Sequence, residues 1–203
     1  MTKPKLTYFD APASRGEECR LALHLAGVDF EDVRVKPPEW AAVKAATPFG
    51  SVPTFELPGK PVLAQSNAIL VYIGRENGLH PKDNFEAARH EMIMGHVEDL
   101  RHVLAATLRM PEDEKKRVRE SIAETTLPVW CANAEKQIGA GPFFGGAKLQ
   151  VADIKLFMMV RWLSGGKLDH IPTTIVAGYP KLVGVHDAVR DHAGIQAWYA
   201  KQR

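Results

Sequence analysis

Short apolar runs alternate with helix-like patterns along the first eighty residues. Strand-like runs and helical spacings occur in the order β-α-β-α-β-β-α. The strand-like runs are 5–9, 30–35, 54–57 and 61–63, and the helical patterns are 17–26, 40–46 and 66–76. The first two strands should be parallel because a helix joins them, whereas the short turn at Pro58-Gly59-Lys60 predicts an antiparallel hairpin. We therefore expect a small mixed sheet covered by helices.

Strand signals disappear after residue 80, and only helical patterns follow. They cover 92–108, 112–138, 153–163, 181–191 and 195–201. Pro128 predicts a kink or break in the second of these helices. The third is apolar on most sides, as a buried central helix would be. The chain is thus predicted to have an α/β domain at residues 1–79 and an all-α domain at residues 80–203.

The composition is that of an ordinary soluble globular protein. Of the 203 residues 45% are hydrophobic and 25% are charged, which excludes a disordered chain, a collagen and a disulfide scaffold. The 26 basic and 24 acidic residues give a formal net charge of +2. Such a balance produces no field that would favour nucleic acid or an anionic membrane as a partner. We expect neither.

Cysteine and histidine usage favours a reducing compartment without a metal site. Cys19 and Cys131 are far apart and in no metal-ligand spacing, which is typical of two reduced thiols. The first residues do not resemble a secretory signal, and no apolar run reaches the roughly 18 residues of a membrane span. His90, His96 and His102 are spread around a helix rather than gathered on one face. We expect a cytoplasmic protein that holds no metal.

Candidate chemistry begins where the first strand ends. Tyr8 closes this strand just before a loop and a helix. A tyrosine there is either a core side chain or a hydroxyl at the carboxyl end of a strand, where α/β folds bind ligands. Ser14 and Arg15 lie at the start of the following helix, as a cap and a solvated charge or as part of the same site.

Three further segments could hold a peptide-sized ligand. Pro53 cannot donate to a sheet, and a cis bond before it would turn the Val52 backbone toward a partner. Gln65-Ser66 opens a helix directly after a strand, either as an ordinary cap worth about 1 kcal/mol or as a carboxylate site. Trp40 and Lys44 lie one helical turn apart on a common face. With Arg15, this face could form a positive rim.

Taken together, these segments closely resemble the glutathione transferases. The motifs "LTYF", "PFGSVPTFE" and "LAQSNAI", with the tryptophan–lysine pair between them, are similar to those of the sigma class, which includes the prostaglandin D synthases. The resemblance covers nearly the whole chain. It implies a thioredoxin-like glutathione-binding domain at 1–79. The all-helical domain at 80–203 would contribute the electrophile pocket and the contacts of a homodimer.

The resemblance also implies a role for each candidate residue. Tyr8 would hydrogen-bond the glutathione sulfur, with Arg15 as the basic residue beside it. The remaining binding residues would be Trp40 and Lys44 for the glycine end, Ser51, Val52 and Pro53 for the cysteinyl unit, Gln65 and Ser66 for the γ-glutamyl carboxylate, and Asp99 for the glutamyl amine across a dimer. For the electrophile we expect Phe9, Arg101, Leu104, Ala105 and Leu108, together with part of the carboxyl tail.

The implied function is conjugation of glutathione, as co-substrate, to small hydrophobic electrophiles in detoxification. A glutathione-dependent isomerase or peroxidase, and a non-catalytic ligand-binding or structural protein, are the alternatives. The chain departs from the family at two points. One extra residue separates Tyr8 from Arg15, so Ser14 is a second candidate hydroxyl donor. The family's Ser/Thr-x-x-Asp capping box is replaced by Gln150 with a retained Asp153.

Overall fold

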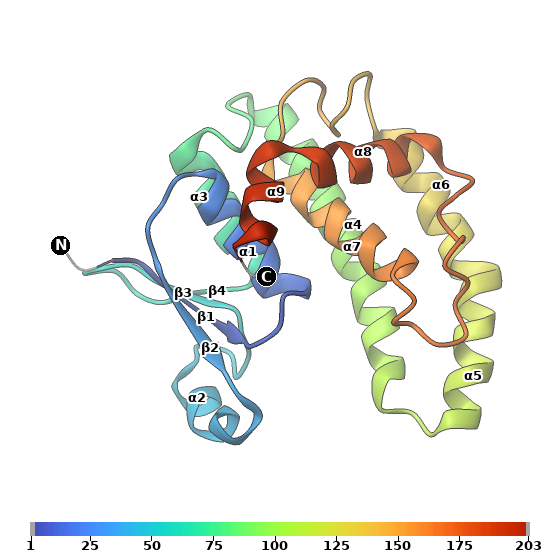
Figure 1. Cartoon of the computed structure of the whole chain (residues 1–203), viewed down its shortest axis with the longest axis horizontal. Coiled ribbons are helices and arrows are strands. Elements are labelled where there is room, and N and C mark those ends of the chain that lie inside the picture. Colours follow the sequence, from blue (N-terminus) through green and yellow to red (C-terminus); the bar gives the residue numbers. More distant parts are fainter. Residues whose placement is uncertain (1–2, 202–203) are drawn as a thin grey trace. The chain divides into compact units, whose positions relative to one another are not determined.

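A computed structural model describes residues 3–201 (Figure 1). Contacts divide the chain into two compact units. The first contains the residues up to Lys82 together with those from Ala193 onward, and the second is Asp83–His192. The sequence division at residue 80 groups the last helix with the helical segments, whereas the contacts group it with the first unit.

The first unit is built on a four-stranded mixed sheet with strand order β2-β1-β3-β4. The strands are β1 (Lys5–Phe9), β2 (Glu31–Val35), β3 (Thr54–Glu56) and β4 (Leu63–Ala64). β1 is parallel to β2 and antiparallel to β3, and β3 is antiparallel to β4. The predicted βαβαββα order, the parallel first pair and the final hairpin are therefore confirmed.

Helices of the first unit accompany this sheet, and the first and third of them contact its strands directly. They are α1 (Ser14–Leu25), α2 (Trp40–Ala46, preceded by a 3-10 turn at Pro37–Glu39), α3 (Ser66–Asn77) and α9 (Ala193–Ala200). α1 packs against both α3 and α9. Leu21 of α1, Leu70 of α3 and Leu6 of β1 are fully buried, and Phe55 of β3 is almost fully buried. This core fixes the helix starts relative to the strand ends.

The second unit consists of helices. They are α4 (Asn84–Ala106, followed by a 3-10 turn at Thr107–Arg109), α5 (Glu112–Ser121), α6 (Leu127–Gln137), α7 (Val151–Ser164) and α8 (Pro180–Asp191). A π-helical turn, Ile122–Thr126, separates α5 from α6 just before Pro128. The expected interruption of the 112–138 helix is confirmed, because proline offers no N–H to the regular helical bonding pattern.

α7 is the buried central helix that its apolar pattern predicts. At its start the Asp153 carboxylate accepts hydrogen bonds from the backbone N–H groups of Phe144 (2.7 Å) and Gln150 (2.8 Å). Asp153 is fully buried, and this burial raises the pKa of its carboxyl to about 7 despite the two donors. Asp153 therefore caps α7 and holds the preceding loop against it.

Two residues expected to line an electrophile pocket are instead buried in the second unit. Arg101 donates to Glu98 at 2.8 Å, and the same carboxylate oxygen lies 2.6 Å from Nζ of the fully buried Lys155. Leu104 is also fully buried. They face inward because their positions on α4 belong to the helical stripe that contacts α7, so the expectation for Arg101 and Leu104 was wrong.

Within residues 3–201, none of the helices is both long enough and apolar enough to cross a membrane. The same residues contain no group of three or more histidine, cysteine or acidic side chains arranged to hold a metal ion.

Candidate functional site

Three strands of the first unit bring candidate residues to one end of the sheet. Thr54 of β3 lies opposite Thr7 of β1 on one side and opposite Ala64 of β4 on the other. The chain neighbour of each of these three residues toward the same sheet end is a candidate residue. The residues at this end are Tyr8, Pro53 and Gln65. Hydrogen-bond register thus gathers residues that are far apart in the sequence.

Tyr8 lies against the first turn of α1 because residue 16 is glycine. A Cβ atom added to Gly16 would lie 2.0 Å from Cδ1 of the tyrosine ring and 2.1 Å from Cγ, far inside van der Waals contact. Tyr8 is 8% exposed, and its ring meets that of Phe9 edge-on with centroids 5.4 Å apart. The sequence reasoning missed Gly16, which lies just before the predicted 17–26 helix, where a glycine permits close approach of another segment.

The start of α1 has an unusual backbone. Ser14 has φ 60°, in the left-handed region that non-glycine residues seldom occupy, and Ala13 before it is extended. Ser14 and Arg15 therefore both lie in the first turn, and both are partly buried. The loop between Tyr8 and Arg15, which contains the extra residue, therefore ends at Ser14 in a left-handed conformation. Backbone strain of this kind is frequent at ligand sites.

The peptide bond between Val52 and Pro53 is cis, which is the form that would turn the Val52 backbone toward a partner. Pro53 is buried and directly precedes β3, whereas Ser51 is exposed. Lys44 of α2 lies beside this segment, since a Cβ added to Gly50 would be 3.4 Å from its Cε atom. α2 thus places a cation beside the backbone before β3.

Trp40 begins α2 and is partly buried against β1. Its ring lies edge-on to that of Phe9, with centroids 5.0 Å apart. α2 follows the carboxyl end of β2, and Figure 1 shows it beyond that end of the sheet. Trp40 and Lys44 share a helix face, as predicted from their spacing. On this face, Trp40 contacts Phe9 at the end of β1, and Lys44 lies beside Gly50 in the segment before β3.

Gln65 and Ser66 form the sharp turn from β4 into α3. Gln65 has φ 70° and is exposed, whereas Ser66 is 4% exposed and is the first residue of the helix. The N-terminus of a helix carries unsatisfied N–H groups and a partial positive charge. The turn therefore presents α3 toward the sheet end as a site suited to a carboxylate.

A buried charge network that the sequence reasoning missed holds the loop after Tyr8. Arg20 of α1 is fully buried and donates to the carbonyls of Phe9 (3.2 Å) and Ala11 (2.9 Å). It also donates to Asp32 at 2.9 Å, and its guanidinium carbon lies 5.9 Å from the centre of the Tyr8 ring. A charged residue within the apolar spacing of 17–26 was the available signal.

The same acidic residue links β2 to this loop. Asp32 accepts a 2.8 Å bond from Nε of Arg34, whose Nη1 reaches Asp10 at 3.3 Å. Burial by itself would lower the pKa of Arg34, but the neighbouring Asp32 carboxylate outweighs it and the pKa is raised. Arg34 lies opposite Tyr8 in the parallel register. The loop is therefore held from α1 and from β2.

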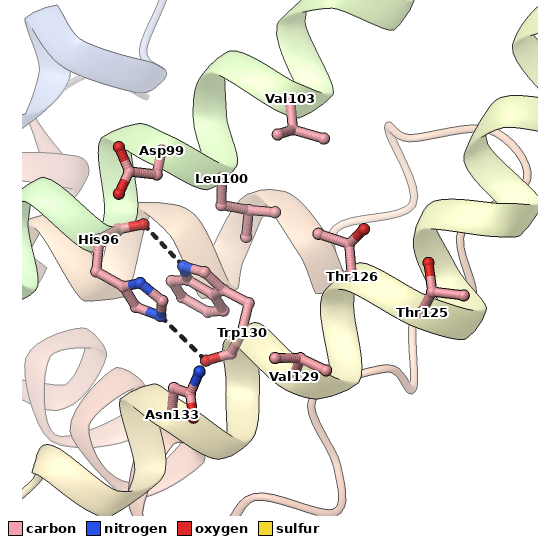
Figure 2. Close-up of a pocket in the computed structure, with 9 residues that line it drawn as sticks. All are labelled: His96, Asp99, Leu100, Val103, Thr125, Thr126, Val129, Trp130 and Asn133. Carbon is pink, nitrogen blue, oxygen red and sulfur yellow. Dashed lines mark hydrogen bonds between the residues drawn. The ribbon is translucent and has the colours of Figure 1, made fainter.

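Asp99 belongs to the second unit, where it is exposed on α4 beside a pocket of about 440 Å³ (Figure 2). The pocket lies between α4 and the segment 125–133. Its walls are His96, Asp99, Leu100, Val103, Thr125, Thr126, Val129, Trp130 and Asn133. Trp130 Nε1 donates to the His96 carbonyl at 2.8 Å, and the two rings stack with centroids 5.1 Å apart.

Comparison with known proteins identifies both halves of the chain. Residues 4–75 match the family model "Glutathione S-transferase, N-terminal domain", and residues 98–202 match "Glutathione S-transferase, C-terminal domain". The chain is 32% identical to glutathione S-transferase 1 of Ascaris suum over 213 residues, covering 100% of this chain and 98% of the relative. It is 28% identical to S-crystallin 4 of Enteroctopus dofleini over 211 residues, covering 97% and 95%.

Among solved structures, prostaglandin synthase D of Nilaparvata lugens superimposes with a TM-score of 0.87. The two sequences are 27% identical, and the match covers 99% of this chain and 98% of the other. Together with the sheet order and the helical second unit, these matches confirm the predicted thioredoxin-like plus all-helical fold and the predicted likeness to prostaglandin D synthases. The chain belongs to the glutathione S-transferase family.

Proposed function

We propose that this chain conjugates glutathione to small hydrophobic electrophiles and that the Tyr8 hydroxyl activates the glutathione thiol. The main support is the position of Tyr8, which lies near the end of β1 at the same sheet end as Pro53 and Gln65 and packs against the first turn of α1 through Gly16. A ligand at this end would meet a phenol hydroxyl, two helix starts and a backbone segment free of strand pairing.

Glutathione has two carboxylates and one ammonium group, and the candidate residues complement its anionic ends. Lys44 and Trp40 would hold the glycine carboxylate from α2. Gln65 and Ser66 would hold the γ-glutamyl carboxylate at the start of α3, where helix N–H groups favour an anion.

The cysteinyl unit would lie between these two sites. The Val52 backbone, ahead of Pro53, is directed away from strand pairing and could bond the cysteinyl amide, with Ser51 at its border. An extended peptide bound in this way uses main-chain hydrogen bonds for affinity. The thiol would then face the end of β1.

Activation of the thiol requires preferential binding of its anion. A thiol with a pKa near 8.5 is only a few per cent ionised at neutral pH, and lowering the pKa by about two units needs roughly 2.7 kcal/mol. A charge-assisted hydrogen bond from Tyr8, the nearby Arg15 guanidinium and the start of α1 could provide this together. Ser14 is the second candidate hydroxyl donor, because it lies in the same helix turn.

The chemical step is then a nucleophilic substitution. The thiolate forms a carbon–sulfur bond to the electrophile and the leaving group departs with the bonding electron pair. No covalent bond to the protein forms. The roles of Tyr8 and Arg15 are to hold the thiolate before the step and to orient it.

Three further parts of the proposal come from the family. The protein would act as a homodimer in the cytoplasm, and Asp99 of one subunit would bind the glutamyl ammonium of glutathione held by the other. Asp99 suits this role because its carboxylate is exposed on α4 beside an open pocket. Light scattering at several protein concentrations tests the dimer.

A glutathione-dependent isomerase is the second candidate, favoured by the likeness to a prostaglandin synthase. It would use the same thiolate, so conversion of a prostaglandin endoperoxide and reduction of an organic peroxide should be assayed beside conjugation. A purely structural protein, the alternative suggested by the crystallin relative, would not need Tyr8, Lys44 and Ser66 together.

The deciding experiment combines calorimetry with a conjugation assay. Wild type should bind glutathione at neutral pH and conjugate it to a chlorodinitrobenzene. Tyr8→Phe should still bind glutathione but lose activity at least about tenfold. Absence of binding to wild type would refute the proposed function. Unchanged turnover in Tyr8→Phe, with loss in Ser14→Ala, would assign the hydroxyl role to Ser14.

A further inference from the structure

The last helix of the chain is bonded to the helix that carries Gly16. Trp198 of α9 donates its indole N–H to Oε1 of Glu17 at 2.7 Å. Its ring also contacts His24 of α1, with centroids 5.2 Å apart. Figure 1 shows α9 beside α1, within the first unit. This contact joins residues 181 positions apart, so it is a tertiary support of α1 rather than part of either helix.

Glu17 is fully buried and its carboxylate has a bonding partner for each oxygen. Oε1 accepts from Trp198, and Oε2 accepts from Nη1 of Arg20 at 3.4 Å. A buried carboxylate is tolerated only when donors and a countercharge replace water. Because the Arg20 contact is long, the short bond from Trp198 is the better-formed of the two.

Arg20 transmits this arrangement to the loop after Tyr8. Its guanidinium donates to the carbonyls of Phe9 and Ala11 while contacting the Tyr8 ring from 5.9 Å. The two carbonyls belong to residues one and three positions beyond Tyr8. Rotation of the guanidinium would therefore move the end of β1. Asp32 restrains the other side of the guanidinium through Nε.

We propose that Trp198 is a positioning residue for Tyr8, acting through Glu17 and Arg20. This inference rests on the proposed function, because it assigns Trp198 to the support of the thiol-activating hydroxyl. Trp198 fixes the Glu17 carboxylate, which orients Arg20, and Arg20 holds the loop carbonyls that set the position of Tyr8. The carboxyl-terminal helix is thus part of the glutathione site without touching glutathione.

The informative variant is Trp198→Phe, which keeps a smaller ring beside His24 and removes the indole N–H. Oε1 of Glu17 then lacks its donor, and the carboxylate will turn toward Arg20 or toward water. A displacement of a catalytic group by a fraction of an ångström is sufficient to lower turnover. We expect kcat to fall roughly tenfold while KM for glutathione changes less than about twofold. The pKa of bound glutathione, followed by thiolate absorbance, should rise by about one unit.

Tyr179→Phe is a matched control in the second unit. It also removes one donor from an aromatic side chain, since the Tyr179 hydroxyl donates to the Pro128 carbonyl at 3.1 Å. It should leave kcat and the thiol pKa unchanged. If Trp198→Phe behaves like this control, the positioning role is refuted.

A double-mutant cycle with Tyr8→Phe tests whether Trp198 acts through Tyr8. Trp198→Phe should have little further effect on kcat in the Tyr8→Phe background, because coupled residues are non-additive. A full tenfold loss there would overturn the inference. If Trp198→Phe does not fold, Glu17→Gln takes its place under the same criteria, since it retains an acceptor for Trp198 and removes the charge facing Arg20.

Amide hydrogen exchange separates this inference from the proposed function. The Asp10 N–H donates to the Val35 carbonyl at 3.1 Å, within the loop that Arg20 holds. Its exchange should be faster in Trp198→Phe than in wild type or Tyr179→Phe, with or without glutathione. Faster exchange in a protein that binds no glutathione would uphold the mechanical link while the proposed function fails. Unchanged exchange would refute the link itself.

Discussion

The Tyr8 ring occupies the space that any side chain at residue 16 would need, because a Cβ atom added to Gly16 would lie 2.0 Å from the ring carbon Cδ1. The obstructing atoms belong to a buried ring on a strand, not to the end of a flexible side chain. The ring and the helix therefore cannot separate without displacing the end of β1. This contact packs the base of the tyrosine ring against the first turn of α1.

Gly16→Ala should therefore lower activity by more than its loss of stability would explain. We expect kcat/KM to fall at least about tenfold and the free energy of unfolding to fall by about 1–3 kcal/mol, since the ring must move to admit the methyl group. Conjugation kinetics and urea unfolding measure the two effects. Gly95→Ala is the control: Gly95 lies within α4 with no atom near an added Cβ, so its stability should rise by up to about 1 kcal/mol.

Ser66→Ala should weaken glutathione binding without a matching loss of kcat. The hydroxyl begins α3 and is proposed to contact the γ-glutamyl carboxylate, where a hydrogen bond to a charged group is worth about 1.5–3 kcal/mol. Calorimetry should thus show a roughly tenfold to hundredfold higher Kd. Ser164→Ala, which removes a hydroxyl bonded to the Val160 carbonyl within α7, should leave the Kd unchanged. Equal Kd values in both variants would exclude Ser66 from the site.

Asp99→Asn should weaken the binding of glutathione but not of an analogue that lacks the glutamyl amine. The proposed carboxylate–ammonium contact disappears in either case, so the two changes should not add. We expect a several-fold higher Kd for glutathione, measured by calorimetry on the dimer. A variant that binds both ligands as wild type does would contradict the proposed role of Asp99.

Because of Asp153, the free energy of unfolding should fall as the pH rises from about 4 to about 7. Burial raises the pKa of its carboxyl to about 7 in the folded chain, so the folded state retains a proton that the unfolded state has already lost. The stabilising contribution is complete below about pH 4 and is lost as pH rises through 7. In urea unfolding, the difference in free energy of unfolding between wild type and Asp153→Asn should become smaller by on the order of 3 kcal/mol as the pH rises over this range. A pH-independent difference would show that Asp153 titrates normally.

Local sequence signals were sufficient for most of the elements. Apolar periodicity and turn residues predicted the order of strands and helices along the chain, the parallel first pair and the final hairpin, and Pro128 predicted the interruption of the 112–138 helix. Trp40 and Lys44 share a face because helical spacing alone determines it. Each of these features depends on residues close together in the sequence, which is why they could be predicted.

Features that depend on tertiary packing could not be predicted in this way. The contact of Glu17 with Trp198 spans almost the whole chain, and nothing in either segment indicates the other. Arg101 is buried although arginine is usually exposed, because Glu98 provides a countercharge inside the second unit. The left-handed conformation of Ser14 likewise follows from how the loop joins β1 to α1 rather than from the serine itself.

The first unit is discontinuous, because it contains the residues up to Lys82 and those from Ala193 onward. During synthesis on a ribosome, α1 emerges early, but α9, which carries the indole partner of Glu17, emerges only after the whole second unit. Until α9 has been synthesised, the Glu17 carboxylate in the nascent amino-terminal half therefore lacks its hydrogen bond from Trp198. Translation arrest or premature termination before Ala193 would leave a polypeptide that has all the strands of this sheet but lacks the hydrogen bond from Trp198 to Glu17.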